Sequence, residues 1–269
     1  MRGTRLLDKM VVALERELLS TLRMRFGFLF EVLLMIAEVA GFYFVARAIG
    51  PQFRPDGVDY FRFVLIGTAL MGLLVSGTAG FVSSIHDAQA SGTLEYLMIT
   101  ATPGPVVIAL FGLATFLERA IRVALLFAFA ALLFGFRVPQ ANLPAFCVIY
   151  VLSVLVTVGI GLLAAAAQIA IHRGSMVVWV AGAATGLLTG AVFPVSALPG
   201  WMQHISAVIP ITQSLNGIRA ALLRGVGLGG MHTEILVLAG YAAVLVPVSV
   251  LVLEATLRRA RRAGSLGLA

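Results

Sequence analysis

The sequence contains 269 residues, of which 60% are hydrophobic and 12% are charged, and its mean hydropathy is +1.03. Soluble domains carry about 25% charged residues, so lipid is the expected solvent for most of this chain.

The net charge is +7, and the single lysine, Lys9, lies between Asp8 and Met10. A nucleotide-binding P-loop requires a lysine that follows glycine and precedes serine or threonine. This polypeptide is therefore not a P-loop ATPase. Its arginines gather at the ends and in short loops, which is typical of membrane topology signals and lipid contacts rather than of nucleic-acid binding.

Residues 5–24 form an amphipathic pattern ahead of the first long apolar run. Apolar residues recur there at helical spacing, namely Leu7, Met10, Val11, Leu14, Leu18 and Leu22. The pattern predicts that residues 1–25 contain a helix that lies in the membrane interface on the cytoplasmic side. The alternative is a charged extension that only anchors the topology.

The region 26–253 is predicted to be a six-helix transmembrane domain, because a bilayer core requires about 20 apolar residues per helix. The predicted spans cover residues 26–48, 62–84, 105–136, 143–171, 175–193 and 232–253. Six spans place both termini on one side, where 11 Lys and Arg residues gather against 6 on the other. The positive-inside rule then predicts cytoplasmic termini in a plasma or inner cell membrane, with residues 254–269 as a basic cytoplasmic tail.

The second loop contains a short helical pattern of its own. Gly92 can end the preceding helix, and Thr93 can cap a new one. Leu94, Leu97 and Met98 then share one face. A short amphipathic helix at the cytoplasmic surface can dock into a groove of a soluble partner. The alternative is an interfacial helix that binds only lipid.

Residues 194–231, between the last two predicted spans, are too apolar for a solvated loop and too interrupted by proline to span. The prolines are Pro194, Pro199 and Pro210, and Trp201 is a candidate interface residue. Because irregular backbone at membrane depth needs protein or water partners, we expect two short re-entrant helices in the outer leaflet. The alternative is one amphipathic helix that lies flat on the outer surface.

Charged residues inside predicted spans are costly in lipid and are functional candidates. They are Glu31, Glu38, Glu118, Arg119 and Arg122. Glu31 and Glu38 lie seven residues apart, on roughly one face of the first span, and the spacing of Glu118 and Arg122 favours an i, i+4 ion pair. These residues line a polar translocation route or, alternatively, pair between spans one and three to fix packing. No catalytic or metal-ligating pattern is visible in the sequence, and Cys147 is interpreted as an apolar-like residue.

Two motifs in this layout resemble the type-2 ABC exporter permease family. The first is Gly92-Thr93-Leu94-Glu95 with Thr102-Pro103, although residues 86–90 lack the denser charge that usually precedes it. The second consists of Phe193-Pro194, Pro199-Gly200-Trp201, Pro210-Ile211-Thr212 and the stretch from Arg219 to Gly225. Together with the N-terminal helix and the six spans, the resemblance covers nearly the whole chain.

The resemblance implies that the chain is half of an export pore, completed by a second copy or a related permease. It also implies separate cytoplasmic ATPase subunits that bind ATP and magnesium, so that this chain carries no cofactor and is not an enzyme. Residues 86–100 would be the coupling helix that receives ATPase motion, and residues 172–174 a second contact. The importer signature, Glu-Ala-Ala followed by Gly, is absent, which favours export of a drug, a lipid or a polysaccharide.

Two rival functions come from other classes. An ion-gradient transporter would use Glu31, Glu38 and Glu118 as proton carriers and would need no ATPase. A membrane-embedded enzyme would need a cluster of nucleophile, base or metal ligands, which the sequence does not suggest.

Overall fold

The computed structural model describes residues 25–90, 104–171 and 174–263, and these residues are all-helical. Six long helices form a bundle, and two short helices and three 3₁₀ turns lie in its connections. The long helices are α2 (Arg25–Ile49), α3 (Tyr60–Ala90), α5 (Gly104–Phe134), α6 (Leu143–Ile171), α7 (Gly174–Leu188) and α10 (His232–Ala263). The short elements are α8 (Gly200–Val208), α9 (Pro210–Leu223), η1 (Pro55–Gly57), η2 (Val195–Ala197) and η3 (Leu228–Gly230).

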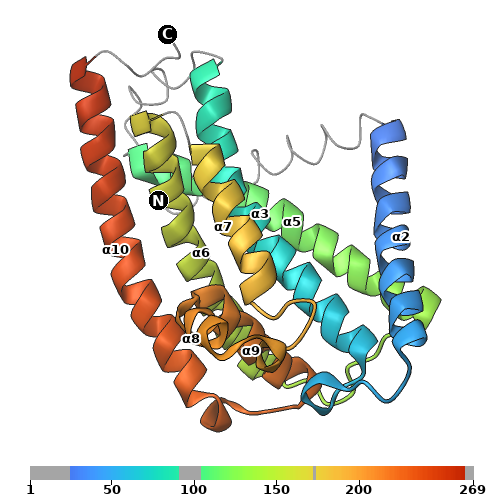
Figure 1. Cartoon of the computed structure of the whole chain (residues 1–269). Coiled ribbons are helices and arrows are strands. Elements are labelled where there is room, and N and C mark those ends of the chain that lie inside the picture. The colour runs from blue at the N-terminus through green and yellow to red at the C-terminus, as the bar shows by residue number, and fades with distance from the viewer. Residues whose placement is uncertain (1–24, 91–103, 172–173, 264–269) are drawn as a thin grey trace.

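The long helices run alternately up and down the bundle, and α5 crosses it obliquely (Figure 1). Helices α8 and α9 lie together at one end, where α2 ends and α3 begins; we call this the α9 end. Helix α3 is the central element, since 67% of its most apolar window is buried, against 11% for α2 and 17% for α10. The bundle is thus built around α3, with α2 and α10 at its periphery.

Four of the described helices are long and apolar enough to cross a membrane: Leu29–Ile49, Tyr60–Gln89, Leu143–Ile171 and His232–Ala260. They correspond to spans one, two, four and six of the sequence prediction. The third predicted span is the 31-residue helix α5, whose Glu118, Arg119 and Arg122 lower its apolar character. The fifth predicted span coincides with α7, which has only 15 residues. At 1.5 Å per residue α7 is about 22 Å long, shorter than a hydrocarbon core.

Three helix ends differ from the sequence prediction by five residues or more. Helix α7 stops at Leu188 rather than at residue 193, because the backbone turns at Gly190, whose φ is +73°. Helix α3 continues beyond residue 84 to Ala90, and α10 continues beyond residue 253 to Ala263. A helix does not need to end where its apolar stretch ends, because its backbone hydrogen bonds are independent of hydropathy.

Small residues allow the central helices to approach closely. The ring of Phe81 on α3 is fully buried between Gly112 of α5 and Gly161 of α6, and a β-carbon at either glycine would overlap the ring. On the same side of α3, Gly77 faces the ring of Phe116. In lipid such close backbone approach drives helix association, because apolar burial alone gives no gain.

Several predicted features lie outside the described residues. These are the N-terminal amphipathic helix, the coupling-helix residues Gly92, Thr93, Leu94, Glu95, Leu97 and Met98, the link at residues 172–173 and the end of the basic tail. Of the predicted coupling segment, only residues 86–90 are described, and they form the last turns of α3.

The glycine packing gives a stability prediction. Gly161→Ala should destabilise the purified protein by about 1–3 kcal/mol, because the new methyl group collides with the Phe81 ring. Gly240→Ala on α10 is the matched control, since nothing lies within 4 Å of its β-carbon position and alanine is favoured in helices. Melting of both variants in detergent checks this, and equal melting temperatures would contradict the packing account.

Candidate functional site

Arg219 of α9 is the most deeply buried charged residue that the structure describes at the α9 end, with 6% of its surface exposed. Its Nη1 donates to the carbonyl oxygen of Gly190 at 2.8 Å. Its Nη2 donates to those of Ala191 at 2.8 Å and Phe63 at 3.0 Å. The guanidinium carbon also lies 3.6 Å from the centroid of the Phe63 ring. One side chain therefore holds together α9, the start of α3 and the segment that follows α7.

The charge of Arg219 is compensated by carbonyl dipoles rather than by a close carboxylate. No carboxylate in the described residues lies within ion-pair distance of it. Gly190 and Ala191 directly follow α7, whose C-terminus carries partial negative charge and has no basic residue in its last turn. Burial lowers the pKa of Arg219 to about 10, and Asp56 opposes this shift, so the guanidinium stays charged at neutral pH.

Other hydrogen bonds fix α8 and α9 to the long helices. Ser206 of α8 donates from Oγ to the carbonyl of Leu188, the last residue of α7, at 2.6 Å. The hydroxyl of Tyr241 on α10 donates to the carbonyl of Val208 at 2.6 Å. These contacts satisfy helix-end carbonyls, which would otherwise be unpaired in a poorly solvated region.

Gly67 on α3 provides the space for the arginine. A β-carbon at this position would overlap both Nη2 of Arg219 and the carbonyl oxygen of Ala191. The close approach of α3, α9 and the segment after α7 therefore requires glycine here.

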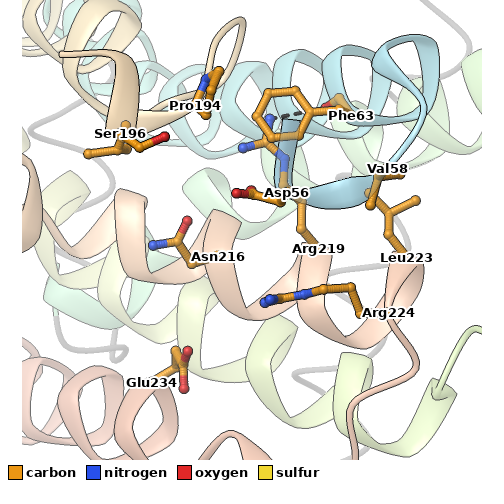
Figure 2. Close-up of a pocket in the computed structure, with 11 residues that line it drawn as sticks. Asp56, Val58, Phe63, Pro194, Ser196, Asn216, Arg219, Leu223, Arg224 and Glu234 are labelled. Atoms are coloured by element: carbon orange, nitrogen blue, oxygen red, sulfur yellow. Dashed lines mark hydrogen bonds between the residues drawn. The ribbon is translucent and has the colours of Figure 1, made fainter. Parts of the chain in front are cut away.

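A cavity of about 270 Å³ opens beside Arg219. Its polar lining comes from several elements: Asp56 in η1, Ser196 in η2, Asn216 and Arg219 in α9, Arg224 directly after α9, and Glu234 in α10. Phe63, Pro194 and Leu223 add apolar walls. Figure 2 shows Asn216, Arg224 and Glu234 directed into one shared space.

The residues predicted for the re-entrant segment occupy distinct positions. Pro210 is the first residue of α9, where proline suits a helix start, and Pro199 directly precedes α8. Pro194 lines the cavity, and Trp201 is 65% exposed on α8. Of these five predicted residues, only Arg219 is buried.

The predicted intramembrane charges lie elsewhere, on α2 and α5. Arg122 Nη1 lies 2.8 Å from Glu31 Oε1. Glu118 Oε2 lies 3.7 Å from Arg119 Nε. Glu38 is exposed on α2. The pairing between spans one and three that the packing interpretation predicts is thus present for Glu31 and Arg122.

Sequence reasoning does not single out Asp56 or Glu234 as site residues. Asp56 belongs to a Pro-Asp-Gly turn and has a left-handed φ of 54°. The turn is recognisable from sequence, but its position beside α9 is not. Glu234 is 178 residues further along the chain, and only the bundle brings the two residues to one cavity.

Comparison with protein families gave a match to the model described as ABC-2 type transporter, over residues 9–223. The matched region runs from the N-terminal segment to the last residue of α9 and includes the second loop. A search among curated proteins gave no match.

The clamp around Arg219 gives the second prediction. Arg219→Lys should lower the melting temperature, because an ammonium group cannot reproduce the planar fork that donates to three carbonyls. Losing one or two such bonds costs about 1–3 kcal/mol each when the acceptors stay buried. Arg137→Lys, at an exposed position, is the control. Gly67→Ala should reproduce the Arg219→Lys defect, and a Gly67→Ala variant as stable as wild type would contradict the clamp.

Proposed function

The chain belongs to the ABC-2 type transporter family, and on this premise we propose that it is the permease subunit of an ATP-driven exporter. In this proposal it forms half of the translocation pathway in the cell membrane. The family match over residues 9–223 is the observation that carries the proposal. The missing P-loop supports it, because a chain of this family without an ATPase motif needs a separate ATPase.

We propose six membrane crossings, with both termini in the cytoplasm. The alternating direction of α2, α3, α5, α6, α7 and α10 supports an even number of crossings. The charges of α5 are compatible with a span because two of its charged residues take part in the pairs Arg122–Glu31 and Arg119–Glu118. The short α7 is extended at its C-terminus by residues up to Ala191, which Arg219 and Ser206 hold inside the protein.

We propose that α8 and α9 re-enter the outer leaflet. Helix α9 is buried along most of its length, including Thr212, Ser214 and Arg219, which supports a position inside the bundle rather than flat on its surface. Several polar groups at its level find protein partners, as irregular structure at membrane depth requires. Ser206, for example, donates to Leu188 and lies 3.5 Å from the hydroxyl of Thr212.

A second permease copy would cover surface that the single chain leaves open. Helix α2 has only 11% of its apolar window buried, and Glu38 is exposed on it. A carboxylate exposed to hydrocarbon is costly. We therefore assign Glu38 to a polar route that the second copy completes.

We propose that α3 passes ATPase motion from the coupling segment into the bundle. Helix α3 has 31 residues, contributes Phe63 to the Arg219 clamp near its start, and ends at Ala90, two residues before Gly92. Its central burial makes it a stiff connection between the two ends. An ATPase that moves residues 92–98 would therefore act on the helix to which the α9 end is attached.

The rival proton-coupled mechanism has less support. Two of its three candidate carriers, Glu31 and Glu118, lie within 4 Å of arginines. Their ion pairs give these carboxylates a packing role that requires no proton exchange.

The ATPase partnership can be tested by affinity purification of the tagged chain from its native membrane, with mass spectrometry of the co-purifying proteins. We expect a P-loop ATPase to co-purify with wild type and to be lost from Leu94→Asp/Leu97→Asp, because the apolar docking face is then charged. Thr100→Asp, off that face in the same segment, is the control and should retain the partner. A chain that purifies alone and transports substrate into vesicles without ATP would contradict the proposal and favour the ion-gradient mechanism.

A further inference from the structure

Four charged residues, two acidic and two basic, line the cavity at the α9 end without pairing with one another. They are Asp56, Arg219, Arg224 and Glu234. The ion pairs among the described residues join Glu31 to Arg122, Glu118 to Arg119 and Glu254 to Arg258, and none involves these four. Opposite charges that share a cavity of about 270 Å³ would ordinarily approach one another. Here the backbones of η1, of α9 with the residue after it, and of α10 hold them apart.

The arginine that forms the cavity wall still has unused donor capacity. Three N–H groups of Arg219 donate to backbone carbonyls, but its Nε is buried without a partner. A buried unpaired donor is rare in native proteins and often marks a missing water or ion. The residue is more than nine-tenths buried and carries a full positive charge into the cavity lining.

The two arginines lie between the two carboxylates of the cavity lining (Figure 2). Arg224 is exposed and its guanidinium extends into the cavity space, while Asn216 offers both an amide donor and an acceptor. Glu234 is half-buried in the first turn of α10. Asp56 lies on the opposite side, near Arg219.

We propose that this cavity binds a zwitterion that combines a phosphate with a primary ammonium group, of the phosphoethanolamine type. The phosphate would be held by Arg224 and the positive field of Arg219, since guanidinium groups match phosphate oxygens. The ammonium would donate to Glu234. Such a ligand places an anionic group against the two arginines and a cationic group against Glu234, which a simple anion or cation cannot do. The cavity volume is compatible with a headgroup of this size, and lipid or a soluble compound could supply it.

Binding is measured by isothermal titration calorimetry on the purified chain in detergent, without any ATPase, so that the result is independent of the proposed exporter function. The probes are phosphoethanolamine, phosphocholine, inorganic phosphate and ethanolamine. We expect phosphoethanolamine to bind most tightly. Phosphocholine should bind less well, because a quaternary ammonium has no N–H to donate to Glu234.

Two variants separate the two ends of the ligand. Arg224→Gln should weaken both phosphoethanolamine and phosphate, by about fivefold for one partly exposed charge contact. Glu234→Gln should weaken phosphoethanolamine to a similar extent but leave phosphate unchanged. Neither residue makes a side-chain hydrogen bond within the described part of the chain, so both variants should fold, and Arg137→Gln is the matched surface control. Absence of measurable binding, equal binding of all probes, or variants that bind like wild type would overturn the proposal.

A second arm identifies the source of the headgroup. The chain is placed in nanodiscs of phosphatidylcholine with and without phosphatidylethanolamine, and retained lipid is measured by native mass spectrometry. Retention of phosphatidylethanolamine that is lost in Glu234→Gln supports the site and assigns a membrane lipid. Titration of soluble phosphoethanolamine without lipid retention supports the site and assigns a free ligand.

Discussion

The α9 end depends on one buried cation. Arg219 is a buried charge, and its guanidinium is stabilised by donating to the carbonyl oxygens of Gly190, Ala191 and Phe63. Removing a charged group from water costs several kcal/mol unless it is compensated, so these three acceptors must stay in place. The need to keep them there connects α9, the turn after α7 and the start of α3 into one unit.

This constraint links the two ends of the proposed permease. Helix α3 contributes Phe63 to the clamp at one end and leads to the predicted coupling segment at the other. Its middle part is packed through Phe81 against glycines of α5 and α6, so that the helix has little freedom to bend. In the proposed permease, motion at the coupling segment would therefore reach the cavity beside α9.

The sequence predicts the long elements well because hydropathy and helix length depend on local residues. It predicts most of the ends of α2, α3, α5 and α6 to within a few residues. It also predicts two short helices between prolines after α7. It misplaces the end of α7, because apolar residues continue past Gly190 although the helix does not. The number of membrane spans is predicted less well than the helices themselves. Four helices meet the criteria of length and apolarity for a span, whereas α5 contains charged residues and α7 is short.

The candidate site was only partly accessible from sequence. Arg219 stands out as a charge in an apolar segment, but its acceptors are backbone carbonyls, which have no signature in side-chain patterns. Asp56 and Glu234 are separated by most of the chain, so their shared cavity follows from tertiary packing alone. The pair between Glu31 and Arg122 was likewise visible only as two charges in separate spans.

The central claim is that the cavity end faces outward while the ends of α3 and α10 face a cytoplasmic ATPase. It is tested most directly by labelling single cysteines in intact cells with a membrane-impermeant maleimide, in a Cys147→Ala background. Ser196→Cys, exposed beside the cavity, should be labelled from outside, whereas Arg262→Cys, exposed near the end of α10, should react only after the cells are opened. The reverse labelling pattern would mean that the topology is inverted and that the coupling segment lies outside the cell. That result would contradict the proposed ATP-driven exporter.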